Sequence, residues 1–229
     1  MTGAADDAPA KDPTLQLEWE CFAAGAELVI GIDEVGRGAV AGPVAVGAHA
    51  VRAGIDAFPA GLRDSKLLSE KRREAMAPLV AEWGPGAVGF GSAPEIDERG
   101  IGPMLGEAAR RALLELHASG VPVDRAVILL DGAHDWLSPA LRTPLDVRTR
   151  VGADRSCASV AAASVRAKVL RDAVMREAHD AHPEYAWASN KGYGSRAHYD
   201  GIARHGLTEL HRRTWIKPDA RAPRDSLDG

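Results

Sequence analysis

Two apolar segments joined by a short glycine-rich turn place the strongest constraint on how this chain folds. Residues 25–34 and 43–51 are short, apolar and rich in β-branched side chains, which is typical of buried strands. The turn between them is too short for the helical crossover that parallel neighbours require. We therefore predict an antiparallel hairpin over residues 25–51.

The rest of the chain alternates between helical and strand patterns. Ser69 is a suitable N-cap for a helix over 69–83. Further helices are expected over 103–120 and 158–182, and further strands over 86–93 and 125–132. Antiparallel strands followed by alternating helices and strands predict an α/β fold in which helices cover a mixed sheet.

Composition favours one domain with a tail at each end. We expect residues 1–24 to be a mostly disordered tail, of which residues 1–15 are rich in Ala, Asp and Pro. Residues 25–218 are expected to form the domain, and 219–229 to be disordered. No apolar run reaches the ~20 residues of a membrane span, and the N-terminus does not resemble a signal peptide. With Cys21 and Cys157 expected to be reduced thiols, we predict a cytoplasmic monomer that has no membrane contact.

Charge is unevenly distributed along the chain. The formal net charge is −4, yet residues 164–218 contain ten Lys and Arg against six Asp and Glu. This basic segment could face a polyanion. A solvated surface of mixed charge explains the same count equally well.

Carboxylates stand at the ends of two predicted strands. Asp33 and Asp131 each end a strand, and Glu34 follows Asp33 directly. Because neighbouring strand residues point to opposite faces, either the strand ends at this pair and the turn redirects Glu34, or one charge is buried and must be paired. Asp154, just before the long helix, is a further candidate. Asp131 could instead be a cap or turn residue, and Asp154 an acid favoured by the helix dipole.

Converging carboxylates suit divalent metal ions. Mg²⁺ and Mn²⁺ prefer hard oxygen ligands, and two such ions can clamp the attacking and leaving oxygens of a phosphoryl transfer. The glycine-rich turn at Gly36, Arg37 and Gly38 is neither a Walker A loop nor a dinucleotide-binding motif. Its glycines still allow a backbone to approach a ligand closely, and Arg37 could hold a phosphate.

Seven motifs in order resemble one family. "GIDEVGRGAVAGPV" is similar to the signature segment of the type 2 ribonucleases H, specifically bacterial ribonuclease HII. Further similar segments, in the same order as in that family, are "LRDSKLLSEKRR", "EIDERGIGPM", "VILLDG", "ADRSCASVAAASVRAKVLRD", "NKGYGSRAH" and "HGLTELHRRTW". The resemblance covers roughly residues 27–218.

The resemblance implies a ribonuclease H-like fold with a helical C-terminal part, and a metal-dependent endonuclease. By this match, Asp33, Glu34, Asp131 and Asp154 bind two Mg²⁺ or Mn²⁺ ions at the scissile phosphate. Family members hydrolyse the RNA strand of RNA–DNA hybrids and cut on the 5′ side of ribonucleotides in duplex DNA, leaving a 3′-hydroxyl and a 5′-phosphate. The implied roles are ribonucleotide removal from DNA and removal of replication primers.

The same match assigns residues to substrate contacts. Gly36, Arg37 and Gly38 would place backbone groups against the ribose 2′-hydroxyl, which distinguishes RNA from DNA. Tyr193 would pack on the next sugar, although plain core packing would also explain a tyrosine there. The remaining matches are to phosphate-contacting positions: Ser65, Lys66 and Lys168.

One segment departs from the family pattern. Many members have Lys-Gly-Asp at the fourth carboxylate, where this chain has Gly152, Ala153 and Asp154. The segment before it is longer than usual and contains Asp135 and Asp146, so Asp154 is chosen by its distance from the following helix. Two alternatives remain open. One is a catalytically weak RNA–DNA hybrid-binding protein, and the other is an enzyme that acts on small phosphates.

Overall fold

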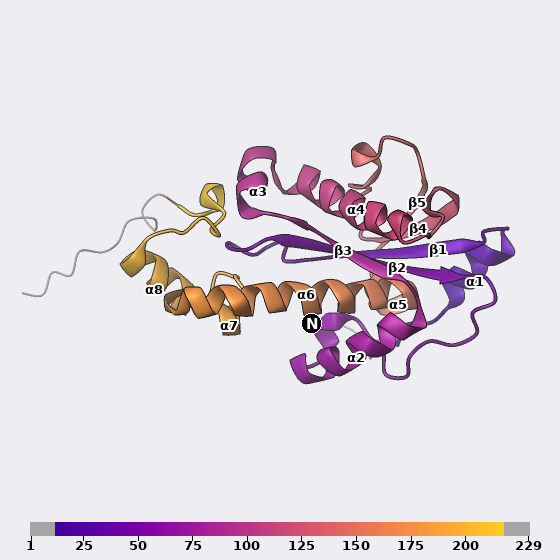
Figure 1. The fold of residues 1–229 in the computed structure, drawn as a ribbon, viewed down its shortest axis with the longest axis horizontal. Helices are drawn as coiled ribbons and strands as arrows, with labels where there is room; N and C mark the ends of the chain where they lie inside the picture. Colours follow the sequence, from indigo (N-terminus) through magenta and orange to yellow (C-terminus); the bar gives the residue numbers. More distant parts are fainter. Residues whose placement is uncertain (1–11, 218–229) are drawn as a thin grey trace, which may run out of the picture.

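The computed structural model describes residues 12–217 and is built on a five-stranded mixed sheet (Figure 1). The strand order is β3-β2-β1-β4-β5. The strands are β1 (Leu28–Val35), β2 (Val44–Arg52), β3 (Gly86–Gly91), β4 (Ala126–Asp131) and β5 (Asp146–Arg150). β2 is antiparallel to β1 and β3, whereas β4 is parallel to β1 and β5. The predicted α/β fold and its antiparallel hairpin are confirmed.

Helices cover both faces of the sheet (Figure 1). α3 (Ala93–Arg99) and α4 (Ile101–Ala118) lie on one face, and α2 (Glu70–Trp83), α5 (Ala153–Ser156) and α6 (Ala158–Ala181) lie on the other. α7 (Trp187–Asn190) and α8 (Arg196–His205) gather at the far end of α6. The predicted helix over 69–83 is confirmed, and the Ser69 hydroxyl caps it by accepting from the N–H of Arg72.

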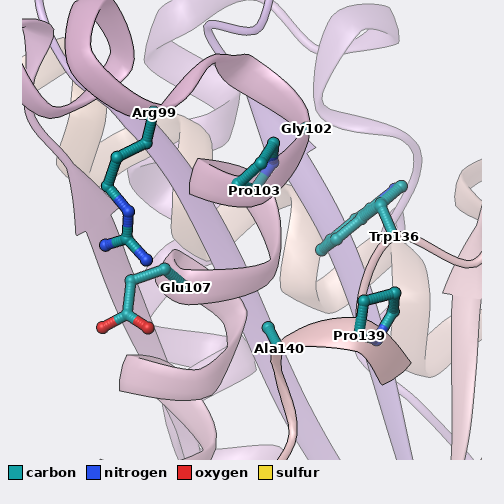
Figure 2. Close-up of a pocket in the computed structure, with 7 residues that line it drawn as sticks. All are labelled: Arg99, Gly102, Pro103, Glu107, Trp136, Pro139 and Ala140. Atoms are coloured by element: carbon teal, nitrogen blue, oxygen red, sulfur yellow. The ribbon is translucent and has the colours of Figure 1, made fainter.

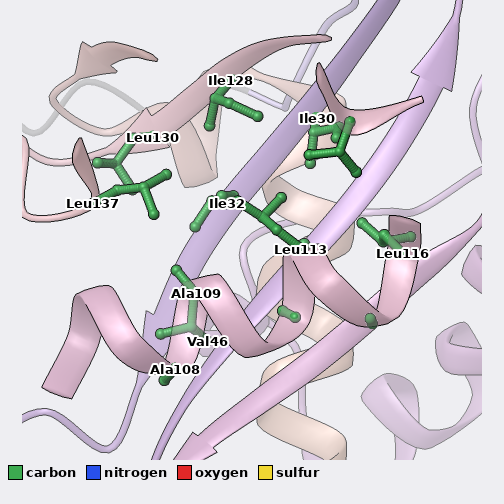
Figure 3. Packing of buried hydrophobic residues seen from close by; sticks show 14 of the residues in the cluster. Ile30, Ile32, Val46, Ala108, Ala109, Leu113, Leu116, Ile128, Leu130 and Leu137 are labelled. Atoms are coloured by element: carbon green, nitrogen blue, oxygen red, sulfur yellow. The ribbon is translucent and has the colours of Figure 1, made fainter. Parts of the chain in front are cut away.

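The larger core lies between the sheet and α4 (Figure 3). Alternate residues of β1, Ile30 and Ile32, point to this face together with Val46 of β2. Leu113 and Leu116 of α4 pack on them and are almost fully buried. Burying one such side chain contributes about 1.5–3 kcal/mol, so this packing fixes which face of β1 is apolar and which carries its other residues.

The opposite face owes its close packing to glycine. A Cβ on Gly31 would lie 2.3 Å from the carbonyl carbon of Ser159, and one on Gly47 would lie 2.2 Å from the carbonyl oxygen of Ala163. The first half of α6 is correspondingly rich in buried alanine. α6 therefore lies directly on β1 and β2, and the chain that leads into α6 is held beside the strand ends.

The N-terminal prediction is corrected by the structure. Residues 1–11 and the predicted C-terminal tail lie outside the described residues, but 12–24 are ordered and include α1 (Gln16–Ala23). Glu18 of α1 is fully buried, and its Oε1 accepts from Cys157 Sγ at 3.0 Å and from the N–H of Ser159 at 2.7 Å. These long-range contacts order a segment whose first residues have the composition of a tail.

β5 was not predicted. Its sequence, "DVRTR", has no apolar run, and most of its residues are exposed. It forms because β4 offers a free parallel edge.

Across residues 12–217, none of the helices combines the length and apolarity needed to cross a membrane.

Candidate active site

Asp33 and Glu34 lie on opposite faces of β1, because the strand continues to Val35. Asp33 shares its face with Val29 and Gly31 and is 1% exposed. Its Oδ2 is buried and has no hydrogen-bond partner among the described residues. Glu34 is partly exposed and lies 3.4 Å from Arg37 Nη1. The structure therefore buries Asp33 completely and leaves Glu34 partly exposed.

Asp131 and Asp154 are brought to Asp33 by the parallel pairing of β1 and β4. Asp131 ends β4, and its side chain follows those of Val127 and Leu129 towards the α6 face. Its Oδ1 accepts from the N–H of Ala153 at 2.8 Å, which anchors the start of α5 at the strand end. Asp154 is consequently 4% exposed and lies beside Asp131.

The two other acids of the long segment lie elsewhere. Asp135 accepts from the N–H groups of Leu137 and Ser138 and so closes a turn. Asp146 is half exposed on β5 and pairs with Arg148 at 2.7 Å. The structure thus brings Asp154, rather than either of these, to the first three carboxylates.

Lys66 and a fifth carboxylate, Asp64, complete the cluster. Lys66 Nζ lies 3.1 Å from Asp154 Oδ2. Asp64 is fully buried, and its Oδ1 accepts from the N–H of Lys66 at 3.0 Å, capping the short helix η1 (Ser65–Leu67). Sequence reasoning missed Asp64, since an acid before a lysine resembles an ordinary turn residue. The signal for it was its place directly before Ser65 and Lys66 in a recognised motif.

The acidic side chains shift one another's ionisation. Burial, together with the charge of Glu34, raises the pKa of Asp33 well above its usual range. Burial also raises the pKa of Glu34 and that of Asp131, the latter aided by the charge of Asp154. Burial alone would lower the pKa of Lys66, but Asp33, Asp64 and Asp154 together raise it. One ammonium therefore offsets several buried acids.

The donor set suits a divalent cation. All of its donors are carboxylate oxygens, and the orphaned Oδ2 of Asp33 is a buried acceptor that needs a partner. Across residues 12–217, no three acidic, histidine or cysteine side chains yet converge closely enough to hold an ion. Lys66 stands among these carboxylates and supplies a counter-charge to them.

The residues predicted to contact the substrate fall into two groups, one exposed and one already engaged with other side chains. Arg37 and Gly38 are exposed on the turn after β1, and Tyr193 is 41% exposed. Ser65 is buried, with its Oγ accepting from Ser164 Oγ at 2.7 Å. Lys168 is held within α6 by Asp172, whose Oδ1 lies 2.5 Å from its Nζ. The turn and Tyr193 are thus open to a ligand, whereas Ser65 and Lys168 are already engaged.

A separate cavity of about 540 Å³ lies on the α4 side of the sheet (Figure 2). Pro103 and Glu107 of α4 line one wall, and Trp136 and Pro139, from the segment between β4 and β5, line the other. Asp33 and Asp131 point to the opposite face of the sheet, so this cavity has no part in the carboxylate cluster.

Comparison with known proteins identifies the family of this chain. The sequence profile of the family described as Ribonuclease HII matches residues 30–218. The chain belongs to the ribonuclease HII family. It is therefore a type 2 ribonuclease H, an endoribonuclease, as the motifs predicted.

Relatives cover most of the chain. A ribonuclease HII of Streptomyces avermitilis is 42% identical over 93% of this chain and 87% of its own length. Ribonuclease HII of Archaeoglobus fulgidus, solved as a complex with PCNA, superposes with a TM-score of 0.62 at 26% identity, over 83% of this chain and 96% of that one. Bst-RNase HIII, solved in complex with Mn²⁺, gives a TM-score of 0.63 at 26% identity, over 89% and 67%.

Proposed function

We propose that this ribonuclease HII family member hydrolyses the RNA strand of RNA–DNA hybrids and cuts duplex DNA on the 5′ side of an embedded ribonucleotide. The products would carry a 3′-hydroxyl and a 5′-phosphate. The observation that carries the proposal is the gathering of Asp33, Asp131 and Asp154 at neighbouring strand ends, with Glu34 beside them. Burial raises the pKa of Asp33, Glu34 and Asp131, and buried carboxylates of this kind suit a site completed by cations and a phosphate.

The metal ligands in this proposal are Asp33, Glu34, Asp131 and Asp154, which would hold two Mg²⁺ or Mn²⁺ ions. Support comes from their oxygen-only chemistry, from the orphaned Oδ2 of Asp33 and from the Mn²⁺ complex of the similar Bst-RNase HIII. When bound, the ions would lower the pKa of a water molecule and stabilise charge on the leaving 3′-oxygen. The chain holds Asp33 and Asp131 on the paired strands β1 and β4.

Recognition of the ribose is proposed for the turn at Gly36, Arg37 and Gly38. Gly38 supports this role, because a Cβ there would meet nothing within 4 Å and its φ is not in the left-handed region. The fold itself therefore does not require glycine at this position, whereas close approach of a ligand does. Tyr193 is exposed enough to pack on the neighbouring sugar.

Phosphate contacts are proposed for Ser65, Lys66 and Lys168. Lys66 is the best placed, since its side chain is 57% exposed. A phosphate would have to compete with Asp172 for Lys168 and with Ser164 for Ser65. We further propose that the protein acts as a cytoplasmic monomer in ribonucleotide removal from DNA and in primer removal.

The direct test uses a labelled DNA duplex that contains one ribonucleotide. The purified protein is incubated with this duplex in Mg²⁺, Mn²⁺ or EDTA, beside an all-DNA duplex and an RNA–DNA hybrid. We expect one metal-dependent cut on the 5′ side of the ribonucleotide and none in the all-DNA duplex. Tight binding without a cut in either metal would instead favour the hybrid-binding alternative.

A further inference from the structure

Two arginines are buried behind the glycine-rich turn without an acidic partner. Arg171 of α6 and Arg212 are both 0% exposed. Among the described residues, neither has a carboxylate oxygen within the 4.0 Å of an ion pair. Burial and the charge of Arg171 lower the pKa of Arg212 to about 9, so it is still a cation at neutral pH. Buried guanidinium groups of this kind must be satisfied by other acceptors.

Arg212 donates to the backbone of the turn. Its Nη2 lies 2.7 Å from the carbonyl oxygen of Gly36, and its Nη1 lies 2.8 Å from that of Arg37. Both Nε and Nη2 also reach the carbonyl oxygen of Gly42, at 3.2 and 3.1 Å. One planar guanidinium thus fixes three carbonyl groups around the turn.

Arg171 ties the same region to the loop that precedes Tyr193. It donates to the carbonyl oxygens of Pro43 at 2.8 Å and Lys191 at 2.9 Å. Its Cζ lies 5.7 Å from the centre of the Tyr193 ring, within the range of a cation–π contact. Gly36 leaves room for this side chain, because a Cβ on Gly36 would lie 2.0 Å from Arg171 Nε.

These contacts determine where the N–H groups of the turn point. In a trans peptide, the carbonyl and the N–H of the next residue point in opposite directions, and the described chain has no cis peptide. Because the Gly36 and Arg37 carbonyls point inward to Arg212, the N–H groups of Arg37 and Gly38 point away from it. Both residues are exposed, and neither N–H donates to another part of residues 12–217.

We propose that Arg171 and Arg212 are positioning residues for ribose recognition. They hold the turn so that the N–H groups of Arg37 and Gly38 point outward, and they fix the position of the Tyr193 ring relative to the turn. The inference rests on the proposed function of the turn, and it identifies what sets the geometry of that turn. Sequence reasoning had no means of finding this role, because both arginines lie in a basic segment that resembles a solvated surface.

The test replaces each arginine with a residue that keeps the charge but loses the planar fork. Arg212→Lys and Arg171→Lys are compared with Arg196→Lys, a control whose side chain is 96% exposed. Binding to a duplex with one ribonucleotide and to an all-DNA duplex is measured by fluorescence anisotropy in EDTA, beside the melting temperature.

We expect wild type and Arg196→Lys to bind the ribonucleotide duplex more tightly than the all-DNA duplex. In each positioning variant the ratio of these two affinities should fall about tenfold, which corresponds to roughly one hydrogen bond. Affinity for the all-DNA duplex should stay the same. An Arg212→Ala variant offers a second readout, since millimolar guanidinium ion should restore the preference.

The outcomes separate this inference from the proposed function. If wild type discriminates and both lysine variants discriminate equally well while folded, the positioning role is overturned and ribose recognition stands. Equal loss of affinity for both duplexes also overturns it, because that pattern reports a general loss of structure. If wild type itself shows neither preference nor cleavage, the proposed function falls and the inference falls with it.

Discussion

The molecule buries charge of opposite sign in two neighbouring regions and treats the two differently. Around Arg171 and Arg212, the positive charge is met by backbone carbonyls that belong to the fold. Around Asp33, the negative charge is met only in part, by the ammonium of Lys66, and Oδ2 of Asp33 is left without a partner. The arginine region is complete without a ligand, whereas the acidic region becomes complete only when cations arrive. Buried charge therefore marks scaffold in one place and a binding site in the other.

The sharpest way to break this comparison is Asp33→Asn. We expect a loss of cleavage of about 1,000-fold or more, because a metal ion contributes several kcal/mol to the transition state. The same change removes a buried charge that lacks a full partner, so the melting temperature in EDTA should not fall. Single-turnover cleavage and thermal unfolding measure the two effects, and unchanged cleavage would contradict the metal-ligand assignment.

Arg212→Met tests the scaffold in the opposite sense. The change leaves the carbonyls of Arg37 and Gly42 without their donor, while that of Gly36 keeps the N–H of Ala39 at 3.2 Å. A buried acceptor without a partner costs about 1–3 kcal/mol. We expect a loss of about 3 kcal/mol in the free energy of unfolding, measured by urea denaturation. Stability equal to that of wild type would show that water replaces the guanidinium without cost.

The two glycines of the turn offer a matched pair. Gly36→Ala places a Cβ against Arg171 at a φ of +83°, so we expect a loss of about 2 kcal/mol in stability. Gly38→Ala meets open space and should leave the melting temperature unchanged while it reduces cleavage at a single ribonucleotide. If Gly38→Ala cuts as wild type does, the turn does not approach the ribose closely.

The smallest effect concerns a buried histidine pair behind the loop of Tyr193. His211 Nε2 lies 3.2 Å from His198 Nε2, and His198 Nδ1 lies 2.9 Å from the carbonyl oxygen of Tyr193. Burial, together with the proximity of His198, lowers the pKa of His211 to about 3. The unfolded chain thus takes up a proton near pH 6.5 that the folded chain refuses, so this contribution is present above pH 6.5 and is lost as pH falls towards 3.

For this pair we expect stability to fall by roughly 1–2 kcal/mol between pH 7.5 and pH 5. The raised pKa values of the acidic cluster act in the opposite direction, because those acids gain stability when they are protonated. The histidine term is therefore isolated by the difference between wild type and His211→Gln, with His117→Gln as an exposed control. An identical pH slope in wild type and His211→Gln would remove the histidine pair as the cause.

Sequence patterns predicted the elements whose signal is local. The hairpin, β4, α2 and α6 have apolar periodicity and, in α2, a clear cap at Ser69. β5 and α1 were missed because one is polar and the other depends on contacts with Cys157 and Ser159, far away in sequence.

The acidic residues of the candidate site could be predicted because each follows an apolar strand or precedes a long helix. Whether Asp33 or Glu34 is the buried member was left open, since it depends on where β1 ends. Asp64 and the two buried arginines were not found. Their roles arise from burial, and the residues next to a charged residue in the sequence do not indicate whether it is buried.

Val35 separates Glu34 from the glycine-rich turn and is itself buried against Ala45 and Ala167. This one strand residue therefore sets the spacing between the proposed metal ligands, Asp33 and Glu34, and the reading groups, which are the backbone N–H groups of the turn proposed to recognise the ribose. The offset between the sugar that is recognised and the bond that is broken is then set by covalent geometry. A one-residue insertion after Val35 would leave Asp33 and Glu34 in their present register and shift Gly36, Arg37 and Gly38 relative to them.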